Sequence, residues 1–202
     1  MMNNDEKMRE EYNLKKEKLS PIIQKDEQLF PLNKETIEKI NKYIEKNGFD
    51  KKVQDIEDFV MEYGLLSDIT KWTTKVKGAH IEKEEDAIID WTKKHKYLWA
   101  IASFAEDVKD ANIEKLTRAA LKHGQAPGMY GFDWFVFMVN KRDDHSKALE
   151  IVERVVRREG SKKDLETFED YRRLNKAEIE QHEFKFLTDV AKGKYSNDNE
   201  NE

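Results

Sequence analysis

IEKINKYIEKNG, residues 37–48, is nearly repeated as IEKLTRAALKHG at residues 113–124. Both phrases space their apolar residues three and four apart, as one face of an α-helix requires, and both end in glycine, which often follows a helix. The same pattern recurs more loosely at Ile69–Gly78 and Leu149–Gly160. The four segments begin at positions 37, 69, 113 and 149, which are 32, 44 and 36 residues apart. Because helical-hairpin repeats have periods of about 33 to 47 residues, this spacing predicts stacked helical hairpins.

No segment of the chain alternates apolar and polar residues convincingly with period two, so a β-sheet is not expected. The predicted fold class is all-α: a short α-solenoid or an irregular bundle of about 9 to 11 helices built from helical hairpins. Any amphipathic helix that ends in glycine resembles another, so an irregular bundle without a true repeat is the alternative. The individual helices are expected at about 33–47, around Val53–Val60 with an end at Gly64, Asp68–Lys77, Ile81–Lys94, Tyr97–Val108, Ile113–His123, Phe132–Asn140, Ser146–Glu159, around Leu165–Leu174 with Ser161 or Asp164 as the cap, and Lys176–Ala191. The apolar residues of Phe132–Asn140 point nearly all round, which predicts a central, buried helix.

Three regions are distinguished by composition. Residues 1–18 are polar and predict a tail or a frayed helix, 19–192 predict a single all-helical, repeat-like domain, and 193–202 predict a disordered acidic tail. The longest apolar-rich stretches, Tyr97–Ala105 and Phe132–Val139, are too short to cross a bilayer. The start of the chain is charged and lacks the apolar core of a signal peptide. We therefore expect a soluble cytoplasmic protein without a membrane partner.

Composition excludes several classes of chemistry. The chain has no cysteine, which rules out disulfides, thiolate catalysis and cysteine-bound zinc or iron–sulfur centres. Its 37 basic and 42 acidic residues give a net charge of −5, which does not indicate a bulk polyanion binder, although a local basic face is compatible with it. Aromatic residues make up 10% of the chain, which argues against disorder throughout.

One stretch carries a resemblance to known proteins. The segment Phe104–Leu116, FAEDVKDANIEKL, followed by Gly124, resembles units of the form FAxxVxxADIxxLxxA…G that some bacterial and phage repeat proteins string together. Asn112 stands where aspartate is usual, and the next unit, Tyr130–Gly160, follows the pattern only loosely. The resemblance implies an all-helical repeat fold. It assigns no chemistry to named residues.

A second pattern concerns catalysis. Arg118 and His123 form an R-x4-H string that resembles the motif of HEPN-type ribonucleases, in which the arginine would hold phosphate and the histidine would act as acid or base. Ala119 stands where a polar residue usually follows the arginine. His123 also lies just before a helix-ending glycine, where a cationic side chain favours the helix C-terminus. We expect this second, non-catalytic role.

Acidic residues gather on two successive helices and could in principle hold Mg²⁺, as in all-helical pyrophosphatases. Their spacing departs from the EExxE and ExxD pattern of that group, so we expect solvated faces. The histidines show no metal-binding spacing, and no phosphate-binding glycine loop or nucleophile motif occurs. We therefore expect no catalytic residue, no metal and no cofactor. The residues concerned are Glu82, Glu85, Asp86, Glu106, Asp107 and Asp110, and His80, His95, His123, His145 and His182.

The candidate binding residues are of two kinds. Large aromatic residues at helical spacing usually belong to a core, but one left exposed would be a candidate contact with a partner. A basic cluster spanning Arg154–Arg173 could follow a nucleic-acid backbone, although acidic residues are interleaved with it. The candidates are Trp72, Trp91 and Tyr130, and Arg154, Arg157, Arg158, Lys162, Arg172 and Arg173.

The predicted function is binding of another protein by a non-catalytic helical-repeat protein, with an accessory or regulatory role in a phage or mobile element as one setting. The main alternative is a nucleic-acid-binding helical module that uses Arg154–Arg173. An all-helical nuclease or hydrolase is the less favoured third hypothesis. The partner and the oligomeric state stay open.

Overall fold

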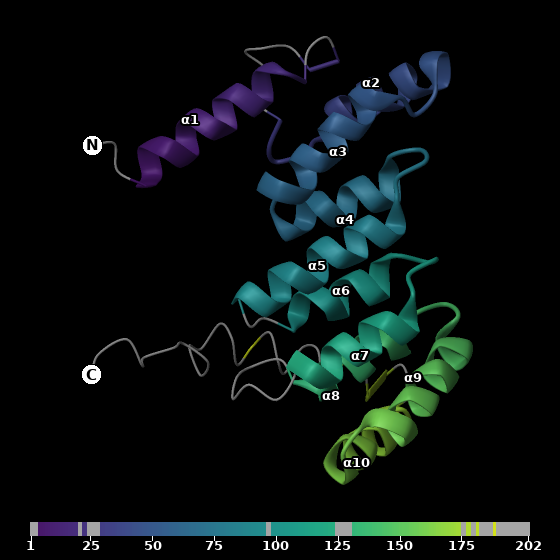
Figure 1. Cartoon of the computed structure of the whole chain (residues 1–202). Coiled ribbons are helices and arrows are strands. Elements are labelled where there is room, and N and C mark those ends of the chain that lie inside the picture. The colour runs from purple at the N-terminus through teal and green to yellow at the C-terminus, as the bar shows by residue number, and fades with distance from the viewer. Residues whose placement is uncertain are drawn as a thin grey trace. The chain divides into compact units, whose positions relative to one another are not determined.

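The computed structural model of the chain describes residues 4–19, 22–23, 29–95, 98–123, 131–174, 177–178, 181 and 188 (Figure 1). Within these residues every regular element is an α-helix, and ten helices are defined, so the predicted all-α fold class is confirmed. The chain divides into two compact units, Met1–Ile88 (unit 1) and Ile89–Glu202 (unit 2). Whether residues 19–192 act as one domain stays a prediction.

Unit 1 holds four complete helices and the first part of a fifth. They are α1 (Asn4–Glu17), α2 (Lys34–Asn47), α3 (Lys51–Tyr63), α4 (Leu66–Lys75) and the beginning of α5 (Ile81–His95). The region predicted as a polar tail or frayed helix is therefore helical over Asn4–Glu17. Caps fix the starts of two helices: Asn33 accepts the backbone N–H of Thr36, and Asp50 accepts those of Lys52 and Val53.

Alternate helices of unit 1 contact each other as well as sequence neighbours. The Asn41 side chain on α2 donates to the Lys75 carbonyl (2.7 Å) and accepts from the Lys77 N–H (2.8 Å), which closes the end of α4. Glu57 on α3 reaches the start of α5, and α3 also packs against α1 and α4. Contacts with the neighbour and with the next helix but one are what stacked hairpins make.

Unit 2 holds the end of α5 and five further helices: α6 (Trp99–Asp107), α7 (Ile113–His123), α8 (Phe132–Asn140), α9 (His145–Glu159) and α10 (Lys162–Tyr171). Its central helix is α8, of whose nine residues seven are buried. This confirms the prediction from its all-round apolar sequence. Helix α8 packs against α6, α9 and α10, while α7 packs against α9, so alternate helices again meet.

The four similar segments correspond to α2, α4, α7 and α9. Within each unit the two copies contact each other, α2 with the end of α4 and α7 with α9. One helix separates the copies inside each unit, whereas α5 and α6 both lie between α4 and α7 along the chain. This extra helix accounts for the longer interval of 44 residues. The resemblance to repeat proteins itself stays a prediction.

The four glycines do not all end their helices in the way that the sequence suggests. Gly48 and Gly78 have positive φ angles of 78° and 73°, but α4 ends at Lys75, two residues before the predicted Lys77. Gly160 has φ −82° and ψ 163°, an extended backbone that any residue adopts. Glycine is needed there because a Cβ atom would lie 2.7 Å from the Val156 carbonyl oxygen.

Some predictions lie outside the described residues. These are Gly124, most of the predicted helix Lys176–Ala191, and the acidic tail 193–202. Among the helices that are described, none combines the length and the apolar character that a bilayer span needs.

Candidate functional site

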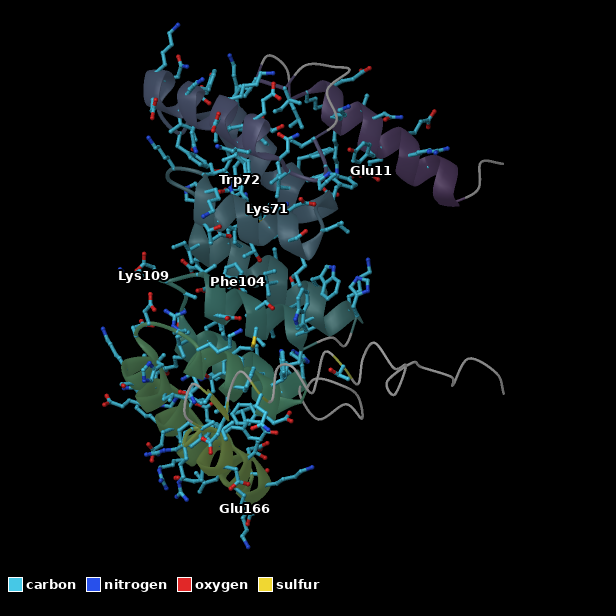
Figure 2. All side chains as sticks on the ribbon, turned by 180° about the vertical axis from the view of Figure 1, so that it is seen from behind. Glu11, Lys71, Trp72, Phe104, Lys109 and Glu166 are labelled. Carbon is cyan, nitrogen blue, oxygen red and sulfur yellow. The ribbon has the colours of Figure 1, made fainter. Side chains whose placement is uncertain are left out.

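The predicted aromatic contacts have three different outcomes. Trp72 lies among the helices of unit 1 (Figure 2) and is fully buried. Its indole N–H donates to Glu57 Oε1 at 3.2 Å. As a candidate contact with a partner it was wrong, because its ring fills the core. Trp91 is half-buried, with its ring centroid 4.4 Å from that of His95. Tyr130 lies outside the described residues.

The predicted basic cluster is an ionic network with glutamates. Arg154 and Arg158 on α9 reach Glu114 on α7 at 3.2 and 3.3 Å, and Arg158 also reaches Glu159 at 2.5 Å. Glu169 on α10 binds Arg157, Arg172 and Arg173, and Glu153 on α9 binds the first two of these. The network, called here the Arg–Glu network, consists of Arg118, Arg154, Arg157, Arg158, Arg172 and Arg173 with Glu114, Glu153, Glu159 and Glu169.

Three glutamates of this network, Glu114, Glu153 and Glu159, are ionised at neutral pH. Hydrogen bonds from Arg158, and next from Arg118, hold the pKa values of Glu114 and Glu159 below their usual range. Those from Arg157 do the same for Glu153. Lys162, the remaining predicted residue, lies 3.6 Å from Glu166. The positive charge that a nucleic-acid backbone would need is therefore already balanced in large part by carboxylates on the same surface.

The R-x4-H pair is not arranged as a phosphate site. The Arg118 guanidinium binds Glu159, with Nε–O distances of 3.0 and 3.1 Å, and also binds Glu114. His123 Nε2 is buried without a hydrogen-bond partner, and desolvation, with smaller effects from Lys122 and Lys93, lowers the pKa of the imidazole. The expected cationic role of His123 at the helix end is thus disfavoured.

The acidic clusters do not gather into a metal site. Glu85 is buried, Glu82 and Asp110 are exposed, and Glu106 pairs with Lys141 at 2.8 Å. In the part of the chain that the structure describes, no group of three or more histidine or acidic side chains is placed to hold a metal ion. The hydrolase hypothesis gains no support from these residues.

The structure assembles a different constellation around Glu57 of α3. Its carboxylate is fully buried and accepts hydrogen bonds from the Trp72 indole (3.2 Å), Gln54 (2.9 Å), the His80 backbone (3.0 Å) and Lys83 (3.2 Å). A fifth contact, of 2.8 Å, joins it to His80 Nδ1. These five residues are called here the Glu57 hub. The hub ties α3, α4 and the start of α5 together.

The hub exists because Glu57 occupies a buried position beside the start of another helix. His80 directly precedes α5, so its backbone N–H has no partner within that helix, and Glu57 supplies one. Burial alone would raise the pKa of Glu57. The hydrogen bonds from His80, Lys83 and Trp72 outweigh burial and lower it. Glu57 is therefore an ionised carboxylate inside the unit.

His80 is the exposed end of the hub. Its side chain is half exposed, and Phe49 meets its ring edge-on at a centroid distance of 4.8 Å. A carboxylate at Nδ1 favours the tautomer in which Nδ1 carries the proton and Nε2 can accept one. An open hollow of about 620 Å³ lies alongside, and its walls carry charges of both signs. It is lined by Gln54, His80, Ile81, Glu82, Lys83 and Asp86.

Glu84 on α5 is also fully buried, but neither of its carboxyl oxygens accepts a hydrogen bond. Desolvation raises the pKa of Glu84 to about 7, and the charge of Glu57 adds to the rise, while Thr73, His80 and Lys83 act in the opposite direction. Among the buried carboxyl groups of unit 1, Glu57 is therefore held ionised, whereas Glu84 is pushed towards its protonated form.

Sequence reasoning missed Glu57 and Glu84. A signal for Glu57 was present, because it lies next to Ile56 on the helix and between Val53 and Val60, which form the buried stripe. The sequence could not reveal that a helix start 23 residues later would face it. His80 was weighed only as a metal ligand, for which a lone histidine has no favourable spacing.

Comparison of the chain with protein-family models, with curated proteins and with solved structures finds no match among any of them.

Proposed function

We propose that this protein binds another protein and has no catalytic role of its own. The observation that carries the proposal is a set of aromatic side chains that follow one another along the chain, in the last turns of α5 and at the start of α6. They are called here the aromatic corner: Trp91, His95 and Trp99. Trp99 is 40% exposed at the first position of α6, and Trp91 is half-buried against His95.

An exposed tryptophan supports a binding role because it leaves a large apolar ring in water. Tryptophan is among the residues most enriched in the contacts that dominate protein–protein affinity. The other large apolar residues that are exposed in the described part of the chain are both aliphatic and both in unit 1, Leu14 and Leu65. The aromatic corner is thus the aromatic surface feature of unit 2 that a partner would cover.

Nucleic-acid binding through Arg154–Arg173 is the weaker hypothesis. A polyanion would have to displace the carboxylates of the Arg–Glu network before it gained contacts with the arginines. Gel shifts with DNA and RNA at two salt concentrations test it directly. Tight binding that weakens steeply with salt would favour nucleic acid over a protein partner. The cytoplasmic location and the phage or mobile-element role stay predictions.

Site-specific photo-crosslinking tests the proposal. A photoreactive amino acid replaces Trp99 in the full chain, produced in the organism that encodes it, and a second variant carries it at Leu65 as the matched exposed control. We expect a discrete protein to be captured from position 99 and not from position 65.

The captured protein is then purified and its affinity is measured. Trp99→Ala should weaken binding by at least about tenfold, as truncation of an interface tryptophan does, while Leu65→Ala should leave it unchanged. Circular dichroism verifies that both variants stay folded. Equal capture from the two positions, or unchanged affinity after Trp99→Ala, would overturn the proposal.

A further inference from the structure

Two of the carboxyl groups that unit 1 buries, one on α3 and one on α5, have unequal surroundings. Glu57 on α3 receives the donors of the hub, whereas Glu84 on α5 receives none. A fully buried carboxyl without donors is costly when ionised, because burial removes its hydration and nothing replaces it. Its neutral, protonated form is far less costly.

The groups around Glu84 relieve only part of this cost. From α3 it faces the ionised Glu57, and the neighbouring cation Lys83 binds Glu57 at 3.2 Å and also Asp58. The imidazole of His80 likewise points its Nδ1 to Glu57. From α4 the neighbour is Thr73, whose hydroxyl donates to the Ile69 carbonyl at 2.9 Å. The nearby positive charge is thus engaged by other carboxylates.

We propose that a single proton on Glu84 controls how the start of α5 packs against α3 and α4. With the proton present, the three helices pack as the structure shows. When the proton leaves, two negative charges face each other in the interior of unit 1. Turning out to water then lowers the free energy of the charged Glu84. The start of α5 then loosens, and His80 and Lys83 move away from Glu57 with it. This inference is independent of the proposed protein binding.

The pH range follows from the two states of Glu84. Buried, it titrates at about 7, and in the opened state it returns to the ordinary value of about 4.5. The packed state therefore holds the proton more tightly. The stability that this proton gives to the packed state is fully present below pH 4.5. It falls as the pH rises towards 7 and is constant above that. Glu57 and Asp58, whose pKa values are lowered, act in the opposite direction and only in more acidic solution.

Hydrogen exchange on the full chain tests the switch. Protection of backbone amides in α3, α4 and residues 81–88 is measured from pH 5 to 8, after division by the intrinsic exchange rates. In the wild type we expect protection to fall by up to about tenfold per pH unit between pH 5 and 7 and then to level off. Glu84→Gln, which imitates the protonated side chain, should give a flat profile. Glu82→Gln, an exposed carboxyl on the same helix, should behave like the wild type.

A second measurement keeps the proposal testable if Glu84→Gln does not fold. Carboxyl carbon NMR of the wild-type chain, with the Glu84 signal assigned, reports its titration directly. A midpoint above pH 6 supports the switch. A midpoint near 4.5, or a pH profile of amide protection that Glu84→Gln leaves unchanged, would overturn it.

Discussion

The two units bury opposite charges for the same structural purpose. Unit 1 buries carboxylates, and Glu57 accepts the backbone N–H that precedes α5. Unit 2 buries a guanidinium, that of Arg142, which donates to the carbonyls of Ala105, Val108 (2.9 Å) and Lys109 (2.6 Å) where α6 ends. Helix starts expose N–H groups and helix ends expose carbonyls, so the sign of the buried charge follows from the helix terminus that it closes.

This difference has a consequence for titration. The backbone carbonyls that Arg142 binds at the end of α6 carry no titratable proton. The carboxyl groups of unit 1 do titrate. Because Glu57 and Glu84 are perturbed in opposite directions, unit 1 should respond to pH on both sides of its optimum. We expect unit 2 to respond less.

The largest effect should come from removing the buried anion. Glu57→Ala leaves the Trp72 indole and the His80 backbone N–H without an acceptor in the interior of unit 1. We predict a loss of about 4 kcal/mol, measured by hydrogen exchange of the α3–α5 amides. The adjacent Asp58→Ala is the matched control: its side chain is half exposed, so its loss should stay below about 1 kcal/mol. Equal losses of stability in the two variants would show that the buried Glu57 stabilises unit 1 no more than an exposed carboxylate does.

Removing the buried cation should have the next largest effect. Arg142→Met keeps the apolar stem but leaves the carbonyls at the end of α6 without donors, and we predict a loss of about 3 kcal/mol confined to unit 2. Arg142→Lys should recover only part of it, because one ammonium group cannot reproduce the planar fork. Urea unfolding followed by exchange of α6 and α8 amides measures both variants.

Arg157→Met is the control for this pair, since that arginine is exposed and binds only glutamates. If Arg142→Lys were as stable as the wild type, charge alone would explain the role of Arg142, and the geometry of its fork would not matter.

A smaller effect should come from the glycine that follows the first of the four similar segments. Gly48, after α2, combines φ 78° with ψ 178°, a conformation that is essentially restricted to glycine, and nothing lies within 4 Å of where a Cβ would stand. We predict that Gly48→Ala costs about 2 kcal/mol through backbone strain alone, measured as the thermal unfolding of unit 1. The exposed neighbour variant Asn47→Ala should be nearly neutral. A neutral Gly48→Ala would mean that the backbone relaxes at no cost.

Much of the fold could be predicted because local signals agree with the packing. Phe132–Asn140 was expected as a buried helix, and α8 has these bounds, since apolar residues all round leave no face for water. The sequence likewise offered Ser161 or Asp164 as the cap of α10; Ser161 is the cap, and the two side chains form a capping box. In both cases the deciding interactions lie within a few residues of each other along the chain.

The candidate site could not be predicted in the same way, because its contacts join residues that are far apart in sequence. Arg142 reaches carbonyls 33 to 37 residues earlier, and nothing in its local sequence identifies it as buried. Glu57 and Trp72 come from different helices, so the sequence left Trp72 open as a surface contact. The arginines of α9 suggested a basic face for the same reason: Glu114, which binds two of them, is 40 and 44 residues away.

The smallest effect should come from the exposed ion pairs, and it tests whether surface charges distinguish the units as buried charges do. In the Arg–Glu network, Arg118 on α7 binds Glu159 on α9 at 3.0 Å, with both side chains well exposed. In unit 1, Lys77 and Glu45 form a comparable exposed pair.

Double-mutant cycles with alanine should give couplings that change the unfolding equilibrium only about twofold at low salt. In 1 M NaCl both couplings should vanish, because the Debye length falls to about 3 Å. A coupling that survives high salt for Arg118 and Glu159, but not for Lys77 and Glu45, would mean that the network is held rigidly. Unit 2 would then rely on fixed surface charge as well as on Arg142, and the contrast with unit 1 would extend from the interior to the surface.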